Sequence, residues 1–289
     1  MTARPTAHPM HAIAGTSIVA LVLAACGGGS SNADTADDAS ASSGTLFHVH
    51  GLGVDPADGH VYVATHNGLY TVAKGQKPKL LGNREDDFMG FTVTDKNTFV
   101  ASGHGDPGSG RPGNLGLIET KDAGRTWTSR SLSGKADFHS MDSAKGTVYG
   151  YEGGRIRVSS NLESWDDRAK LEALDLAVNP SGSKLLATTA DGVVASTDGG
   201  QTFGKAVKPL QAFVSWPAEK SLFGISTSGE LSSSADGGTS WKKLTAVPGG
   251  QPHALTAVNS DHILAATTTG VYESRDGGKT FSELAPLTS

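Results

Sequence analysis

Short apolar runs alternate with turn-forming residues from about Thr45 to the end of the chain. Runs such as Val61–Thr65 and Leu185–Thr189 have the length and the branched side chains of buried strands. A glycine follows each of these runs within a few residues, at Gly68 and Gly192, and a further apolar run comes after it. The recurring order is strand, turn, strand, glycine, strand, turn, strand. This order predicts four-stranded units and an all-β fold.

A second pattern, Ser/Thr-x-Asp-x-Gly-x-Thr-aromatic, recurs before the last strand of five units. In such a turn the aspartate accepts backbone N–H bonds and the glycine supplies a positive φ, while the aromatic side chain packs between neighbouring sheets. These roles are structural, so we assign no catalysis to the aspartates. The third residues of the five copies, 39, 37, 38 and 40 residues apart, are Asp122, Asn161, Asp198, Asp236 and Asp276.

Repetition of one unit at this period is the sequence signature of stacked blades. A sixth unit surrounds Gly68; it keeps the paired apolar runs but lacks the aspartate turn. A single blade cannot bury both faces of its sheet, so blades stack around a central channel. The sequence therefore predicts a six-bladed β-propeller over residues 45–289. The repeated turn resembles the Asp box, or BNR repeat, of sialidases, sortilin-type receptors and photosystem assembly factors.

The first part of the chain has a different composition. Residues 1–25 join a short leader containing Arg4 to an apolar stretch that is too short to span a bilayer but suits a signal peptide. Leu23–Cys26 resembles a bacterial lipobox, which implies that Cys26 is lipidated and becomes the mature N-terminus. Residues 26–44 then form a flexible linker of Gly, Ser, Ala, Asp, Asn and Thr after the cysteine. We expect an exported protein, lipid-anchored to a cell-envelope membrane on its extracytoplasmic face.

Composition narrows the function classes. The formal net charge is −5 and no basic patch stands out, so we expect no nucleic-acid partner. Cys26 is the only cysteine, so we expect no internal disulfide. The 38 glycines and the 18% share of charged residues are typical of a turn-rich β protein.

Most histidines of the mature chain align with one face of the predicted ring. Of the ten histidines, His8 and His11 precede Cys26, which leaves eight. Two of these eight, His60 and His262, align with turns on the opposite face. The other six stand just before first strands or just after second strands, which open on the same face: His48, His50, His66, His104, His139 and His253.

Asp87 and Met89 belong to that face as well. Imidazole, thioether and carboxylate together suit copper or zinc, and the methionine favours copper. The sequence therefore predicts a copper or zinc site formed by His48, His50, His66, Asp87, Met89, His104 and His139. A site for a small organic ligand is one alternative, and histidines without a ligand are another.

Blade 2 carries an insert rich in Gly and Pro at residues 103–114, on the histidine face. Such a loop over a site predicts a lid or a binding loop, and a tolerated surface insertion is the alternative.

A closer resemblance rests on five segments. They are His48–Leu52, Thr65–Leu69, Asp87–Phe91, Ser102–His104 and Asp137–His139. These segments are similar to a family of bacterial Asp-box lipoproteins labelled glycosyl hydrolase-like, and that label implies hydrolysis of a glycan.

Sialidases grip the substrate carboxylate with three arginines and use a tyrosine–glutamate pair. Here the candidates for such a pair are Tyr151 and Glu152, at the end of a second strand. The carboxylates that could assist them on the same face are Glu85, Asp86, Asp87, Asp137 and Asp175. The Arg-Ile-Pro signature of sialidases is absent from the sequence. Besides an exo-sialidase type of hydrolase, we consider a scaffold that contacts another envelope protein.

Overall fold

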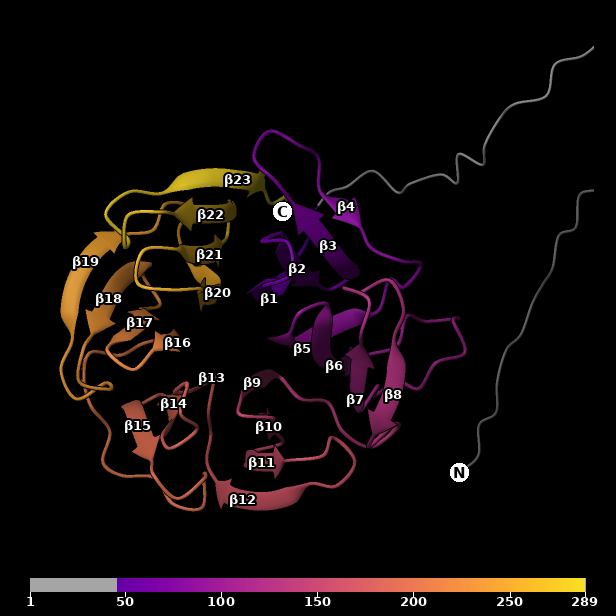
Figure 1. The fold of residues 1–289 in the computed structure, drawn as a ribbon, viewed down its shortest axis with the longest axis horizontal. Helices are drawn as coiled ribbons and strands as arrows, with labels where there is room; N and C mark the ends of the chain where they lie inside the picture. Colours follow the sequence, from indigo (N-terminus) through magenta and orange to yellow (C-terminus); the bar gives the residue numbers. More distant parts are fainter. Residues whose placement is uncertain (1–45, 289) are drawn as a thin grey trace, which may run out of the picture. The chain divides into compact units, whose positions relative to one another are not determined.

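The computed structural model describes residues 46–288, which form six β-sheets arranged as a propeller around a central channel (Figure 1). The signal peptide, Cys26 and the linker expected from the sequence lie outside the described residues. No helix within residues 46–288 has the length and hydrophobicity needed to cross a membrane. The prediction of an all-β, six-bladed propeller is confirmed.

The blades follow one another along the chain, and within each blade the strands pair in sequence order. Blade 1 contains β1 (Val49–Val54), β2 (Val61–Thr65), β3 (Gly68–Val72) and β4 (Lys79–Leu80). Blade 2 contains β5 (Asp87–Asp95), β6 (Thr98–His104), β7 (Leu117–Thr120) and β8 (Thr128–Ser131). Blade 3 contains β9 (Ser140–Ala144), β10 (Thr147–Glu152), β11 (Arg155–Ser159) and β12 (Asp166–Lys170).

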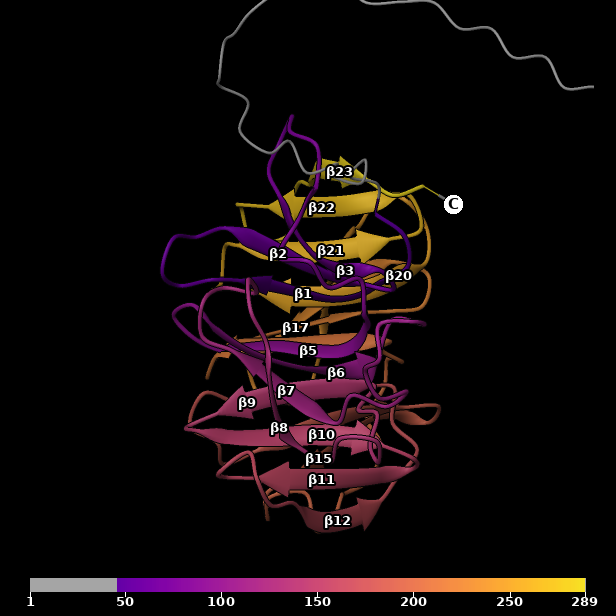
Figure 2. The ribbon, with the colours of Figure 1, turned by 90° about the vertical axis from the view of Figure 1, so that its right-hand side faces the viewer.

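Blades 4 to 6 complete the ring. Blade 4 contains β13 (Asp175–Val178), β14 (Leu185–Thr189) and β15 (Gly192–Ser196). Blade 5 contains β16 (Phe213–Ala218), β17 (Ser221–Ile225), β18 (Glu230–Ser234) and β19 (Lys242–Ala246). Blade 6 contains β20 (Pro252–Ala257), β21 (Ile263–Thr267), β22 (Gly270–Ser274) and β23 (Ser282–Pro286). In the side view of Figure 2, the strands of blade 6 (β20 to β23) and those of blade 3 (β9 to β12) are stacked one above another.

Blade 4 departs from the expected four strands. Its outer edge is a single bridge, in which the backbones of Val193 and Val207 exchange two hydrogen bonds. Pro209 follows closely and has no N–H to donate, so it cannot continue a ladder. The sequence pattern of the other blades therefore overestimated the regularity of this one.

The ring closes without exchange of a strand between blades. Leu46 forms a parallel bridge with Leu287, and Thr288 donates its backbone N–H to the carbonyl of Leu46. At the channel, Thr256 Oγ1 of β20 donates to the carbonyl of Leu52 in β1 at 2.8 Å. Leu46 is fully buried in an apolar cluster shared by blades 1 and 6, so packing and these bonds together join the first blade to the last.

The repeated aspartate turns have the structural role expected for them. In the blade 2 copy, Asp122 accepts bonds from the backbone N–H and the hydroxyl of Thr126. The aromatic residue that ends this copy, Trp127, packs on Phe88 with ring centroids 5.2 Å apart. The same carboxylate bonds recur at Asp198, Asp236 and Asp276. Hydrogen bonds to the carboxylate lower the pKa of these three aspartates.

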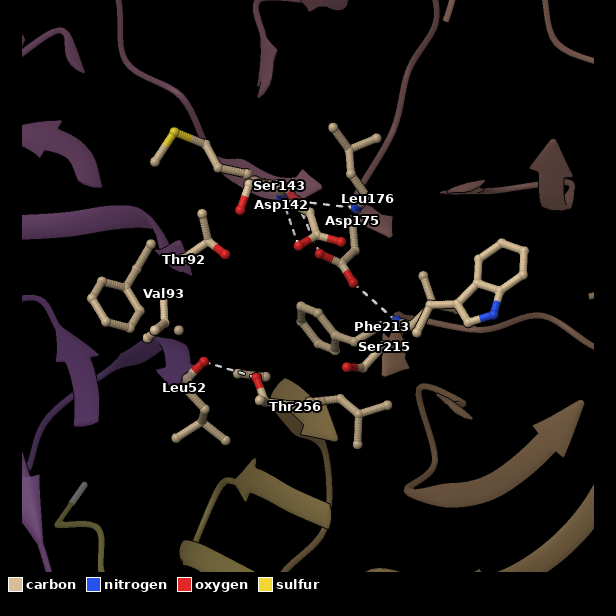
Figure 3. A pocket seen from close by; sticks show the side chains of 18 of the residues that line it. Leu52, Thr92, Val93, Asp142, Ser143, Asp175, Leu176, Phe213, Ser215 and Thr256 are labelled. Atoms are coloured by element: carbon tan, nitrogen blue, oxygen red, sulfur yellow. Dashed lines mark hydrogen bonds between the residues drawn. The ribbon is translucent and has the colours of Figure 1, made fainter. Parts of the chain in front are cut away.

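Half-buried polar side chains connect the first strands of blades 3 to 6 across the channel wall (Figure 3). Asp142 accepts the backbone N–H of Val178, and Asp175 accepts that of Val214. Ser215 accepts the N–H of Ala257 in the same manner. These bonds satisfy inner-edge N–H groups that would otherwise face the channel unpaired.

Candidate metal site at the channel mouth

The channel holds a cavity of about 520 Å³ lined by the first strands of all six blades. This volume lies within the range of small-molecule and cofactor sites. His50, Met89 and His139 line the cavity at the end where the first strands begin. We call that end the channel mouth.

The register of the sheets defines six equivalent positions at this mouth. The first regularly paired residues of the inner strands are Gly51, Gly90, Ser140, Asp175, Phe213 and Ala254. The residues just before them are His50, Met89, His139, Leu174, Ala212 and His253. The mouth is thus histidine-rich on blades 6, 1, 2 and 3 and apolar on blades 4 and 5.

A first set of ligand-type atoms joins blades 1 and 2. One oxygen of Asp87 lies 3.3 Å from His50 Nε2, and the other lies 2.8 Å from His66 Nδ1. Asp87 is 8% exposed, whereas the His66 side chain is 64% exposed, so the set is reachable from solvent. Within residues 46–288, these three residues are the one group of histidine and carboxylate ligands whose atoms all lie within 4.8 Å of one another.

Two atoms of this set have no hydrogen-bond partner in the protein although they are buried. They are His50 Nε2 and Asp87 Oδ1, which lie 3.3 Å apart without the alignment of a hydrogen bond. A tetrahedral zinc ion with bonds of about 2.0–2.1 Å holds its ligand atoms about 3.3 Å apart. The pair therefore has the spacing of two metal ligands, and a cation would satisfy both atoms.

A second set joins blades 2 and 3. The Oδ2 atom of Asp137 lies 3.1 Å from His104 Nε2 and 2.8 Å from His139 Nε2. The other oxygen of Asp137 is buried without a partner. The seven predicted ligands therefore do not converge as one group; the structure gathers five of the six histidine and aspartate ligands into two sets, with Asp137 as the centre of the second.

Glycines in the first strands allow close packing of the blades that carry the two sets. A Cβ atom on Gly53 would lie 2.6 Å from Val93, and one on Gly90 would lie 2.4 Å from the carbonyl oxygen of Phe138. The absence of side chains at these positions lets blades 1, 2 and 3 approach more closely than a larger residue would allow. The two sets thus lie at seams where the inner strands approach closely.

A buried clamp fixes the backbone beside Asp87. Asp86 is fully buried and accepts bonds from Arg84 Nε at 2.5 Å and Arg111 Nε at 2.7 Å. It also accepts the backbone N–H of Asp106 at 2.8 Å. Arg111 and Asp106 belong to the insert of blade 2, so the clamp ties that loop to the strand bearing Asp87. The insert is therefore an anchored loop beside the site.

Electrostatics differ among the mouth histidines. The hydrogen bond to Asp137 raises the pKa of His139, and the charges of Asp87 and Glu152 act in the same direction. Burial lowers the pKa of His253, and the nearby His48 and His50 lower it further. His253 thus lies within electrostatic range of the first set and favours its neutral form, which is the form that binds metal.

His48 and Met89 lie near the first set without joining it. His48 precedes β1 with a φ of 41°, so the backbone at this residue is not that of an extended strand. Its ring centroid is nevertheless 6.1 Å from that of His66. Met89 lines the cavity together with His50 and His139.

The residues proposed for hydrolysis have other partners. The Tyr151 hydroxyl donates to Glu172 at 3.0 Å, and burial raises the pKa of this tyrosine. Glu152 forms an ion pair with Arg157 at 3.3 Å, so Tyr151 and Glu152 do not form the expected pair. Asp86 and Asp175 are engaged by arginines or by neighbouring blades.

From the sequence, Asp137 was not predicted as a metal ligand and Glu172 was not predicted as a partner of Tyr151. Asp137 and Glu172 stand at the position that Asp87 occupies in blade 2, two residues before the mouth position. Each reaches back to the second strand of the preceding blade, as Asp87 does. The parallel between Asp87–Gly90 and Asp137–Ser140 was the signal that could have revealed Asp137 as a partner of the mouth histidines.

No protein-family model matches the chain, and no curated protein matches it in sequence. Among solved structures it is similar to YCF48 bound to a D1 peptide, with 17% identity, a TM-score of 0.53 and coverage of 83% of this chain and 81% of that one. YCF48 from Cyanidioschyzon merolae gives 14% identity and a TM-score of 0.50, over 83% and 85% of the two chains.

An ancestral GH74 enzyme gives 13% identity and a TM-score of 0.55, over 86% of this chain and 39% of the enzyme. At these identities the likeness concerns the fold alone, and this chain spans well under half of the GH74 enzyme. The comparisons therefore establish a β-propeller related in architecture to YCF48 and to part of a GH74 enzyme.

Proposed function

We propose that this propeller binds a transition metal at its channel mouth, through His50, His66 and Asp87. The observation that carries the proposal is the convergence of two imidazoles and one carboxylate within 4.8 Å. Imidazole and carboxylate ligands suit zinc and copper(II), and the neighbouring His48, His253 and Met89 offer further donors for copper. The open side of His66 leaves room for a water or a small ligand on the ion.

Metal content of the purified protein tests this proposal. We expect the protein to bind zinc or copper, and Asp87→Asn or His66→Gln to weaken binding at this site more than tenfold because each removes one of three ligands. His60→Gln is the matched control, since His60 pairs with Asp58 at 2.7 Å outside the mouth. Equal binding by wild type and Asp87→Asn, in isothermal titration with either ion, would rule out the site.

We further propose that the mature protein is held at the cell envelope by a lipid on Cys26, as the lipobox-like segment Leu23–Cys26 implies. The resemblance to Asp-box lipoproteins supports this placement. Cys26→Ser should move the protein from the membrane fraction to the soluble fraction of the envelope, while a substitution in the linker such as Ser30→Ala should not.

Glycoside hydrolysis is a second candidate, supported by the Tyr151–Glu172 hydrogen bond, which pairs a phenol with a carboxylate. The raised pKa of Tyr151 works against its use as a nucleophile, because the phenolate form is disfavoured. Release of a chromogenic aglycone by wild type, abolished in both Tyr151→Phe and Glu172→Gln, would establish this candidate. Retention of that release in Glu172→Gln would remove the pair from consideration.

A further inference from the structure

The apolar half of the channel mouth faces the same cavity as the proposed metal site. Leu174 and Phe213 line this cavity from blades 4 and 5, and His50 of the first set lines it from blade 1. The cavity, of about 520 Å³, is far larger than a water molecule and has the volume of a small-molecule site. One bound molecule can therefore touch the first set and the apolar half together.

The apolar half carries large hydrophobic side chains that the fold leaves exposed. Within residues 46–288, the exposed large hydrophobic side chains are Phe47, Leu174, Leu210 and Val258. Two of them stand at the mouth on neighbouring blades, Leu174 at the mouth position of blade 4 and Leu210 two residues before that of blade 5. The ring of Phe213, one residue beyond the mouth position of blade 5, lies at the channel (Figure 3). Apolar surface gathered beside a cavity is a feature of ligand sites.

The first set leaves a bound ion with a free position. Zinc is almost always tetrahedral in proteins, and His50, His66 and Asp87 supply three of its ligands. The His66 side chain is mostly exposed and His50 lines the cavity, so a further ligand can reach the ion from solvent or from the cavity. In catalytic zinc sites this position holds water or substrate.

The charge of the loaded site favours an anion at that position. Two neutral imidazoles and one carboxylate leave a divalent ion with a net charge of about +1. An anionic ligand neutralises this charge, whereas water or another neutral group does not. Among the described residues that line the cavity none is a lysine or an arginine, while Asp142 and Asp175 both line it. An acid therefore finds no permanent cation in the cavity unless the ion is bound.

We propose that the metal-loaded mouth binds an organic carboxylate with an apolar body. This inference rests on the proposed function and names the ligand class of the same site. The carboxylate binds the ion at the first set, and the apolar body lies over Leu174 and Phe213 on the other side of the mouth. Removal of that body from water makes the site selective for such an acid over a small one such as acetate.

Titration of acids into zinc-loaded protein tests the inference. Acetate, hexanoate and phenylacetate share one head group and differ in the apolar body that they carry. We expect hexanoate and phenylacetate to bind about tenfold more tightly than acetate in calorimetry, because the equivalent of two methylenes leaves water. Leu174→Ser should weaken these two acids about fivefold and leave the binding of acetate and of zinc unchanged.

Val258→Ser is the matched control. Val258 is also an exposed hydrophobic residue that lines the cavity, but it follows the last residue of β20 and so lies at the far end of the channel. Its replacement should leave the binding of all three acids unchanged. A loss of hexanoate affinity in Val258→Ser and none in Leu174→Ser would place the acid at the far end and overturn the inference.

The remaining outcomes separate this inference from the proposed function. Loss of hexanoate binding in metal-free wild type and in Asp87→Asn supports the inference, as does a shift of the visible absorption of cobalt-substituted protein when hexanoate is added. Failure of wild type to bind any of these metals overturns the proposed function, and the inference falls with it. Zinc binding with no preference for hexanoate over acetate overturns the inference alone, and so does hexanoate binding of equal strength in metal-free protein.

Discussion

The inner strands of blades 1, 2 and 3 are joined differently from those of blades 3, 4 and 5. In the first group, Gly51, Gly53 and Gly90 allow neighbouring inner strands to come close, and titratable side chains remain available at the mouth. In the second group, carboxyls inside the channel wall take up inner-edge N–H groups, and the mouth carries Leu174 and Ala212. The same fold thus has a chemically open half and a structurally saturated half.

The two groups also differ in whether their carboxylates keep an oxygen without a hydrogen bond. Asp142 and Asp175 use both oxygens as acceptors of bonds from their own and neighbouring strands. Asp87 and Asp137 each keep one buried oxygen without a hydrogen bond. In this protein, the carboxylates with a partner-free oxygen lie at the seams where glycines let the blades approach.

Gly90→Ala should have the largest effect on the packing of the open half. The new Cβ would lie 2.4 Å from the carbonyl oxygen of Phe138, a backbone atom that can move only if blades 2 and 3 separate. We expect a loss of about 1–3 kcal/mol of unfolding free energy, the range of overpacked cores, and weaker metal binding by the first set because Gly90 follows Asp87 in β5. Urea denaturation and zinc titration measure the two effects.

Gly204→Ala is the matched control, because its Cβ would meet only the carbonyl oxygen of Ala195, at 3.6 Å. Its stability should change by no more than about 0.5 kcal/mol. Equal stability of the two variants would mean that the close approach of blades 2 and 3 does not depend on Gly90.

The saturated half should make stability depend on pH. Burial raises the pKa of Asp142 to about 7 and that of Asp175 to about 6, both above the ordinary value near 3.8. Folding therefore takes up protons between about pH 4 and 7, and stability should fall as pH rises through that window. A shift of one pKa unit corresponds to about 1.4 kcal/mol of unfolding free energy. Because both side chains are partly open to the channel, we expect a total fall of only about 1–2 kcal/mol, less than their full shifts would give.

Denaturation curves of metal-free protein between pH 4.5 and pH 7.5, at about half-unit steps across the expected titration, measure this fall. Asp142→Asn should flatten the dependence, since the amide does not ionise, although it also loses one backbone bond and so lowers stability at acid pH. A steeper dependence in Asp142→Asn than in wild type would contradict the assignment to this carboxyl.

The repeats predicted the ring because each blade carries its own strands and turn, and these are local features of the chain. Alignment of the repeats also placed six histidines on one face, which the structure bears out for the ring positions of His50, His139 and His253. The division of the ligands into two sets was beyond the sequence. It depends on which side chain each carboxylate meets across a seam, and Asp137 and Glu172 meet different groups although they occupy equivalent positions.

Arg111→Ala should loosen the insert with a smaller cost. Arg84 and the N–H of Asp106 still hold the buried Asp86, so we expect a loss of about 1 kcal/mol in place of the larger cost of an unpaired buried charge. Amide exchange in residues 105–113 should increase, because the loop loses one of its bonds to Asp86. Lys243→Ala, which removes an exposed ion pair with Glu230, should alter none of these measurements.

Leu174→Ser and Leu210→Ser should have the smallest effect. Leu174 occupies the position equivalent to His139, and Leu210 lies two residues before the mouth position of blade 5; their exposed fractions are 53% and 43%. Exposed side chains contribute little to folding, so unfolding free energy should stay within about 0.5 kcal/mol of wild type. Zinc titration should also be unchanged, since neither residue belongs to the two sets. A tenfold loss of zinc affinity in either variant would instead mean that the apolar half shapes the metal site, and the two halves of the mouth would then have to be treated as one.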